Sequence, residues 1–156
     1  MSVNVYTASS CIYPGTADAS GGVGIYFGPS VRRNFAGRLP GKDQTSQRAE
    51  LGAIKRALII LSNPKYAPRD KPLAYIYTRS KYAVGCATTW PLKWVRNGWR
   101  NNKGFAIANK DLIVDIITLL LLSPYQVRLV HVSRDSNDQY SKVAQEMAAR
   151  AARRGC

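Results

Sequence analysis

An arginine stands where a buried strand is expected to meet a helix, in the segment "AYIYTRSKYAVG" at residues 74–85. Residues 74–77 form a short apolar run typical of a core strand, and a helical pattern begins at Lys81. In α/β proteins the ends of such strands carry the groups that bind ligands and do chemistry. Arg79 brings a fixed positive charge to this position, and that charge can hold a carboxylate or contact a phosphate.

A second segment, "TTWPLKWVRNGWRNNKG" at residues 88–104, mixes cations with aromatic rings. Lysine and arginine side chains bind phosphates, while tryptophan rings give stacking or packing surfaces. We predict that this segment faces nucleic acid and that one or two of its tryptophans belong to the core. A solvated charged face or a protein interface is the alternative. The residues concerned are Trp90, Lys93, Trp94, Arg96, Trp99, Arg100 and Lys103.

The whole chain is strongly basic. Its 156 residues contain 23 lysines and arginines against 9 acidic residues, which gives a formal net charge of +14. An excess of this size favours a polyanionic partner, most often nucleic acid. A membrane surface is the weaker interpretation, because no basic amphipathic helix with an aromatic face stands out. Further cations spread along the chain are Arg32, Arg33, Lys42, Arg48, Lys81, Arg150, Arg153 and Arg154.

The cysteines and the apolar segments indicate a compartment. Cys11, Cys86 and Cys156 are odd in number and lack C-x-x-C spacing, which fits a reducing environment without disulfides or a structural zinc. The N-terminus lacks the apolar core of a signal peptide, and Asp115 interrupts the longest apolar stretch. We therefore expect an intracellular protein of the nucleus or the cytoplasm, with an organelle left open, and no membrane partner.

Hydrophobic periodicity predicts one mixed α/β domain over residues 1–156, with helices on the faces of the sheet. Strands are expected at residues 3–7, 23–27, 31–39, 74–77 and 125–132, with a loop rich in glycine, proline and serine between the first two. Helices are expected after a cap at Thr45 or Ser46, from Lys81, in part of 88–104, over 109–124 and, as a basic C-terminal helix, over 137–154.

Four motifs carry a family resemblance: "YTASSCIYPG", "RLPGKDQTSQRAELGAIKRAL", "YTRSKYAVGCATTWPLKWVRNGWRNNKG" and "NKDL". In this order and spacing they resemble the cellular ribonuclease H family, particularly its eukaryotic type, from Val3 to about Ala149. The resemblance implies the ribonuclease H-like fold, a five-stranded mixed sheet with helices on both faces. In that family four carboxylates bind two Mg²⁺ ions, which cut the RNA strand of an RNA–DNA hybrid.

This sequence departs from the family at the positions of those acids. The family pattern Y-T-D-G-S has Ala8 at its acidic position here, and Arg79 replaces the acid of Y-T-D-S. Glu50 keeps the acid of the R-A-E pattern, while the fourth acidic position falls on Ser141 after a shortened loop. Because Mg²⁺ needs anionic oxygen ligands close by, we expect a pseudoenzyme with no catalytic residues, no metal and no cofactor.

The remaining acids leave alternatives open. We expect Glu50 to form an ion pair with Arg79 across the position where the family binds metal, and a remaining single-metal site is the other interpretation. Asp135 replaces the flexible catalytic histidine of the family's loop. Asp135 or Asp138 can supply an acid if the alignment shifts by one residue, which would leave a rearranged nuclease site.

The resemblance also implies contacts with nucleic acid. Residues Thr45, Ser46 and Gln47 occupy the family's T-N-Q positions, which reach phosphate and the minor groove of the hybrid, although the same residues also suit a helix cap. Lys42 lies where the family has a basic residue beside its phosphate pocket. Trp90 and Trp94 match aromatic residues that line the channel for the DNA strand.

These expectations give a leading function and two alternatives. The leading interpretation is a catalytically inactive ribonuclease H-like domain that binds an RNA–DNA hybrid or double-stranded RNA through a basic surface, by shape and backbone. The alternative is a structural or adaptor module that docks onto a protein or ribonucleoprotein partner. A hybrid-cleaving nuclease with a rearranged metal site is the third.

Overall fold

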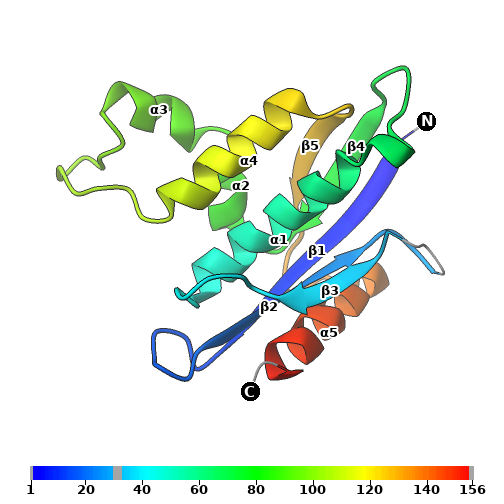
Figure 1. Ribbon diagram of the computed structural model, residues 1–156, viewed down its shortest axis with the longest axis horizontal. Coiled ribbons are helices and arrows are strands. Elements are labelled where there is room, and N and C mark those ends of the chain that lie inside the picture. Colours follow the sequence, from blue (N-terminus) through cyan, green and yellow to red (C-terminus); the bar gives the residue numbers. More distant parts are fainter. Residues whose placement is uncertain (1, 30–32, 155–156) are drawn as a thin grey trace.

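The computed structural model describes residues 2–29 and 33–154, and its centre is a five-stranded sheet in the order β3-β2-β1-β4-β5 (Figure 1). Strands β1, β2 and β3 pair in antiparallel fashion, whereas β4 lies parallel to both β1 and β5. This confirms the predicted mixed sheet. The strands are β1 (Val3–Ile12), β2 (Ser20–Tyr26), β3 (Phe35–Arg38), β4 (Leu73–Thr78) and β5 (Gln126–His131).

Four sequence expectations fall wholly or partly on parts of the chain that are not described. The third strand, expected over residues 31–39, is observed as Phe35–Arg38, and residues 31 and 32 lie outside the described ranges. Residues 33 and 34 belong to the turn before it, where Oδ1 of Asn34 accepts from the backbone N–H of Phe27. The predicted cation Arg32 and the third cysteine, Cys156, lie outside them too, as does the side chain of Arg154.

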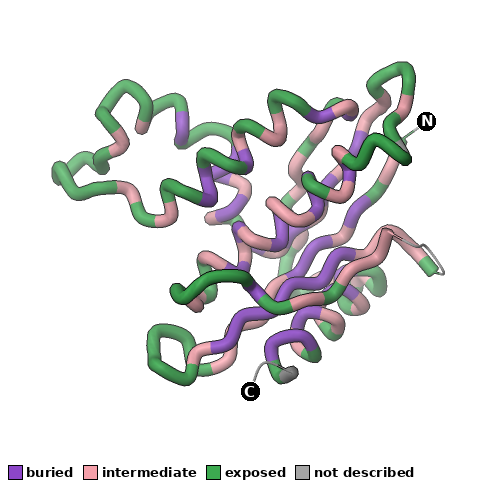
Figure 2. Tube along the Cα trace, in the orientation of Figure 1, coloured by how far each residue is buried: buried purple, intermediate pink, exposed green. Residues whose placement is uncertain are grey.

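Helices α1 (Ser46–Leu61) and α4 (Lys110–Leu122) cover one face of the sheet, and α5 (Gln139–Arg154) covers the other (Figure 1). Helix α1 buries the face that the sequence predicts, with Leu51, Ile54 and Leu58 fully inaccessible. Val5 of β1 and Ile76 of β4 meet this helix from the sheet. The main core therefore lies between α1 and the central strands, where burial is concentrated in Figure 2.

Helix α5 packs on the sheet by close backbone contact. Its alanines Ala144 and Ala148 are fully buried against the sheet. The strand below them carries Gly22 and Gly24, where any Cβ atom would meet the helix backbone; the Cβ at Gly24 would lie 2.2 Å from the carbonyl oxygen of Ala144. Small residues on both partners thus bring the basic helix against β1 and β2.

The first strand is longer than the sequence predicts. A loop is expected from residue 8 to Gly22, but β1 continues to Ile12 and β2 begins at Ser20, which leaves residues 13–19 as the connection. The added length forms because Ser9 pairs with Val23 and Ile12 pairs with Ser20. Hydrogen bonds from β2 satisfy the backbone groups of this polar part of β1. The local sequence of residues 8–12 does not reveal that β2 will pair with it.

One short helix and the segment that follows it project from the sheet as a handle, defined here as residues 88–109. Helix α2 (Lys81–Ala87) leads into it and α3 (Trp90–Arg96) forms its first part, which Figure 2 shows as mostly exposed. Trp94 and Trp99 are partly buried against the main core, whereas Trp90 is 41% exposed. Two of the three tryptophans therefore pack as core residues, as predicted.

In the described part of the chain, no helix is both long and apolar enough to cross a membrane.

Replacing Gly24 with alanine tests the close packing of α5. The added Cβ would press on the backbone at Ala144 and Ala148, which cannot rotate away, so we expect destabilisation of about 1–3 kcal/mol or more. Thermal or urea unfolding measures it. The matched control is Gly37→Ala, whose Cβ would have the ring atoms of Phe35, a side chain that can turn, as its three nearest neighbours. Equal losses in both variants would contradict this account of the packing.

Candidate functional site

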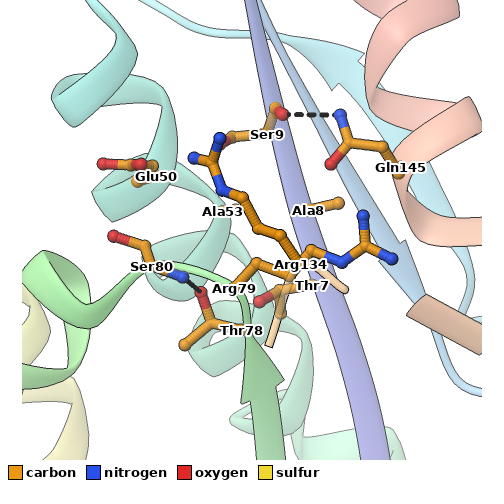
Figure 3. Close-up of a pocket in the computed structure, with 10 residues that line it drawn as sticks. All are labelled: Thr7, Ala8, Ser9, Glu50, Ala53, Thr78, Arg79, Ser80, Arg134 and Gln145. Atoms are coloured by element: carbon orange, nitrogen blue, oxygen red, sulfur yellow. Dashed lines mark hydrogen bonds between the residues drawn. The ribbon is translucent and has the colours of Figure 1, made fainter. Parts of the chain in front are cut away.

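A pocket of about 220 Å³ opens where β1 and β4 separate. The two strands pair in parallel from Val3 and Ala74 up to Tyr6 and Tyr77, after which β1 continues with β2 alone. Helices α1 and α5 bring further side chains to the opening. Its lining residues are Thr7, Ala8, Ser9, Glu50, Ala53, Thr78, Arg79, Ser80, Arg134 and Gln145 (Figure 3).

Three of the four positions at which the family carries acids meet in this pocket. Ala8, Glu50 and Arg79 all line it, but Ser141 does not. Ser141 is buried in the first turn of α5, where its hydroxyl donates a hydrogen bond to Oδ2 of Asp138 at 2.8 Å. Gln145, one turn further along α5, lines the pocket instead, and its Nε2 donates to the carbonyl oxygen of Ser9 at 2.9 Å.

The expected ion pair between Glu50 and Arg79 is wrong. Among the described residues the ion pairs within 4.0 Å are Arg48–Asp111 and Lys55–Asp115. The direction of the strand explains the difference. Along β4 the buried Ile76 and Thr78 face α1, whereas Tyr77 points to the opposite face. Arg79 follows Thr78 directly, and by the same alternation we infer that it lies on the side of Tyr77.

Aromatic contacts identify that opposite face as the side of α5. The ring of Tyr77 stacks on Tyr6 with centroids 4.6 Å apart, and Tyr6 in turn contacts Tyr140 of α5 at 5.2 Å. Glu50 comes from α1, on the other side of the sheet. Arg79 and Glu50 therefore enter the pocket from different faces of the sheet.

Glu50 has a different cationic neighbour, which the sequence did not single out. Burial raises the pKa of the Glu50 carboxyl above its usual value, while a hydrogen bond with Ser80 and the positive charge of Arg134 act to lower it. Figure 3 shows two guanidinium groups on different sides of the pocket, one beside Glu50 and Ser9 and one towards Gln145. The sequence feature that could have identified Arg134 as a site residue is its position in the loop that directly follows β5.

Arg79 keeps an unsatisfied donor. Its Nε is buried and has no hydrogen-bond partner. Nearby hydroxyls are engaged elsewhere: Thr7 donates to the carbonyl oxygen of Tyr77 at 2.7 Å, and the Ser80 hydroxyl accepts from the backbone N–H of Ala83 at 3.0 Å as the cap of α2. The pocket thus contains a buried N–H that no side chain around it satisfies.

The pocket does not fit a pair of Mg²⁺ ions. It offers one carboxylate, Glu50, beside two guanidinium groups, and the residues that the structure describes hold no cluster of three or more His, Cys, Asp or Glu side chains suited to a metal. The two alternative acids, Asp135 and Asp138, do not add a carboxylate to this pocket. Asp135 is exposed outside the pocket, and Asp138 accepts from the backbone N–H of Tyr140 at 3.1 Å as well as from Ser141.

A second hollow of about 560 Å³ lies at the start of α1 and brings Lys42, Thr45 and Arg48 together. Thr45 caps the helix, since its hydroxyl accepts from the backbone N–H of Arg48 at 3.1 Å. Ser46 and Gln47 are exposed in the first turn and do not line the hollow. The capping role is therefore observed for Thr45, and the contact of all three residues with nucleic acid stays a prediction.

Arg48 ties α1 to α4. Its guanidinium makes a two-pronged ion pair with Asp111, with nitrogen–oxygen distances of 3.0 and 2.8 Å, and also donates to Asn109 at 3.3 Å. Hydrogen bonding from Arg48 lowers the pKa of Asp111 to about 2. Asn109 also lines this hollow, and its amide donates to the hydroxyl of Tyr82 at 2.9 Å. It is not among the site residues expected from the sequence, and its place in the "NKDL" motif is the one sequence feature that points to it. Lys42 is the exposed cation of this hollow.

A third hollow of about 310 Å³ lies on the handle. Four of the predicted residues line it together: Trp90, Lys93, Trp94 and Arg100. The other predicted handle residues lie apart from it: Trp99, beneath Lys110 with 5.2 Å from Nζ to the ring centroid, and the exposed Arg96 and Lys103. The handle also exposes three apolar side chains that the sequence did not single out, Leu92, Val95 and Phe105.

The chain matches one protein family over its whole length. A family model described as RNase H covers residues 1–156. Ribonuclease H1 of Mus musculus is 32% identical over 151 residues, which cover 94% of this chain and 50% of that protein. The chain thus spans about half the length of the first curated relatives it matches.

Solved structures share the fold at lower identity. The PFV RNase H domain aligns with a TM-score of 0.73 and 21% identity, over 97% of this chain and 94% of that domain. A foamy viral protease-reverse transcriptase in complex with an RNA/DNA hybrid aligns with a TM-score of 0.71 and 23% identity, over 96% of this chain and 20% of that chain. At these identities the likeness concerns the fold.

The raised pKa of Glu50 predicts a pH-dependent effect of Glu50→Gln. The folded-state pKa of Glu50 lies above the ordinary value of 4.5, so the folded chain holds this proton more tightly than the unfolded chain does. The free energy of unfolding is therefore highest below the ordinary pKa and falls as the pH rises through the folded-state pKa. We expect Glu50→Gln to raise Tm at pH 7, by at most about 4 °C, and to leave it unchanged at pH 4. Thermal unfolding at the two pH values measures this. The control is the exposed Glu146→Gln; the same rise in both variants would contradict the role of burial.

Proposed function

Because the chain belongs to the ribonuclease H family, we propose that it binds an RNA–DNA hybrid or double-stranded RNA without cutting either. The observation that carries this proposal is the pocket between β1 and β4. Ala8 and Arg79 stand there at the positions of two family acids, and Arg134 adds a second guanidinium. The pocket thus offers cations where the family's chemistry needs anionic ligands.

The loss of cleavage follows from the chemistry of the family reaction. Two divalent ions clamp the attacking water and the leaving oxygen, and anionic oxygens must hold both ions. A fixed cation about 4 Å from a divalent ion adds repulsion of roughly 8 kcal/mol at an effective dielectric of 20, and Glu50 is the sole acid lining the pocket. Curated relatives of this chain are named as ribonucleases H, so cleavage is the activity against which the chain is compared. Ala8 and Arg79 are the pocket residues at which it departs from the family pattern.

Binding is supported by the handle and by the net charge. Lys93 and Arg100 lie beside Trp90 in the handle hollow, an arrangement in which cations contact phosphates and a ring packs against sugar or base. Lys42 adds an exposed cation at the start of α1. A structural neighbour, the foamy viral reverse transcriptase, has been solved with an RNA/DNA hybrid. Recognition by backbone and shape suits such a surface.

One observation favours the adaptor function as a second candidate. Leu92, Val95 and Phe105 are 73%, 63% and 68% exposed, and all three lie on the handle. Exposed apolar side chains grouped on a projecting segment are typical of protein–protein contacts. This second candidate predicts a protein partner that survives nuclease treatment, whereas the leading proposal predicts a partner that nuclease releases.

The binding proposal predicts salt-dependent affinity that depends on the handle. For the double variant Lys93→Gln/Arg100→Gln we expect at least a tenfold loss of affinity for a hybrid near 0.1 M salt, and a decrease of about 2 in the slope of log K against log[salt]. Fluorescence anisotropy across a salt series measures both. The control Arg150→Gln/Arg153→Gln removes the same charge from exposed positions of α5. Equal losses of affinity in the two variants would contradict a specific role of the handle, because they would show that the net positive charge of the chain alone sets the affinity.

The proposed inactivity predicts no specific cleavage of a labelled hybrid with Mg²⁺ or Mn²⁺. Restoring acids with Ala8→Asp/Arg79→Asp gives Glu50 two carboxylate neighbours, and we expect that variant to gain measurable Mg²⁺ binding by calorimetry. Gel analysis of the labelled strand detects cutting. Cleavage by the unmodified chain that disappears in Glu50→Ala would overturn the proposal, since it would show a working metal site.

A further inference from the structure

We propose that the pocket between β1 and β4 binds a phosphate group, held by Arg79 and Arg134. The ligand is a phosphomonoester or phosphodiester oxyanion, carried either by the backbone of a nucleic acid or by a free phosphorylated molecule. The inference concerns the pocket itself and rests on the proposed function only where the phosphate belongs to a hybrid or to double-stranded RNA.

Arg79 carries an unsatisfied hydrogen-bond donor. A buried N–H without a partner costs free energy in the folded chain. Nε of Arg79 is such a group, and it belongs to a side chain that lines the pocket. Because Nε itself is closed off from solvent, an oxyanion in the pocket binds the terminal nitrogens of the same guanidinium, which form no ion pair in the described structure. Guanidinium groups bind phosphate through parallel N–H···O bonds, which fits this donor better than a neutral ligand does.

The fixed charges around the pocket are mostly positive. An adjoining hollow of about 390 Å³ shares Glu50, Arg79 and Arg134 with the pocket and is also lined by Lys81 and His131. Three fixed cations therefore surround one carboxylate. Glu50 interacts with Ser80 and with the charge of Arg134, while neither an ion pair nor a hydrogen bond engages the guanidinium of Arg79 in the described structure.

The size of the pocket limits what can enter it. Sites for whole small molecules usually measure about 300–1,000 Å³, and this pocket measures about 220 Å³. It therefore suits a single phosphate group better than a complete nucleotide. The adjoining hollow gives the rest of the ligand a way out, past Lys81 and His131.

Thermal unfolding of the full chain with increasing inorganic phosphate tests the inference. A saturable rise in Tm is expected, about 5–10 °C at a hundredfold excess over Kd. Arg79→Gln and Arg134→Gln should each weaken phosphate binding at least tenfold. The control Arg150→Gln removes one charge from an exposed position of α5 outside the pocket and should leave binding unchanged. Sulfate at equal ionic strength separates oxyanion binding from salt effects, because it should compete with phosphate whereas chloride should not.

Folding of the variants is checked without phosphate. Arg79→Gln removes an unsatisfied buried donor, so its Tm without phosphate should equal or exceed that of the unmodified chain. If Arg79→Gln does not fold, Arg79→Lys keeps the charge but loses the guanidinium fork, and it should still bind phosphate more weakly. The inference is overturned by a rise in Tm that does not saturate, or by a loss of binding that is equal in Arg150→Gln.

A competition experiment separates the two sources of phosphate. If the ligand is a nucleic-acid backbone, phosphate displaces a labelled hybrid and Arg79→Gln weakens hybrid binding. If the ligand is a free phosphorylated molecule, phosphate still binds at saturating hybrid and Arg79→Gln leaves hybrid affinity unchanged. Phosphate binding that depends on Arg79 in a chain that binds no hybrid would support this pocket while refuting the proposed function.

Discussion

The separation of β1 from β4 beyond the Tyr6–Tyr77 pair is the constraint on which this site depends. Up to that pair the two strands bond in parallel register, and beyond it β1 bonds with β2 alone. The backbone of β1 therefore stays paired while a polar pocket opens beside it. Helix α1 reaches the pocket from one face of the sheet with Glu50, and α5 reaches it from the other with Gln145.

Because the pocket lies at the edge of the core, its charge can change without loss of the fold. The apolar contacts that hold α1 to the sheet come from residues such as Leu51, Ile54 and Ile76, which face away from the pocket. Ala8, at the position of an acid in the family, packs under Ala144 and Ala148 of α5. The fold of the family thus persists here while the side chains of the site differ from the family pattern, since core packing and the lining of the pocket depend on different side chains.

The handle is attached to the core at defined points. Trp94 and Trp99 pack against the main core and anchor the handle, and this leaves Trp90 and the neighbouring cations at its surface. The ion pair between Arg48 and Asp111 joins the start of α1 to the start of α4. Cations held in this way lose less conformational freedom when they bind phosphates than cations on a free tail would lose.

The sequence by itself determined the mixed sheet and the buried face of α1, because short-range periodicity carries that information, while the resemblance of its motifs to a family implied that Ala8, Glu50 and Arg79 share one site. Only the tertiary structure decided how those side chains meet. Strand alternation turns Arg79 towards α5, so the charge beside Glu50 comes from Arg134, which is distant in sequence. The extension of β1 to Ile12 and the turning of Ser141 towards Asp138 likewise depend on hydrogen-bond partners that local patterns do not specify.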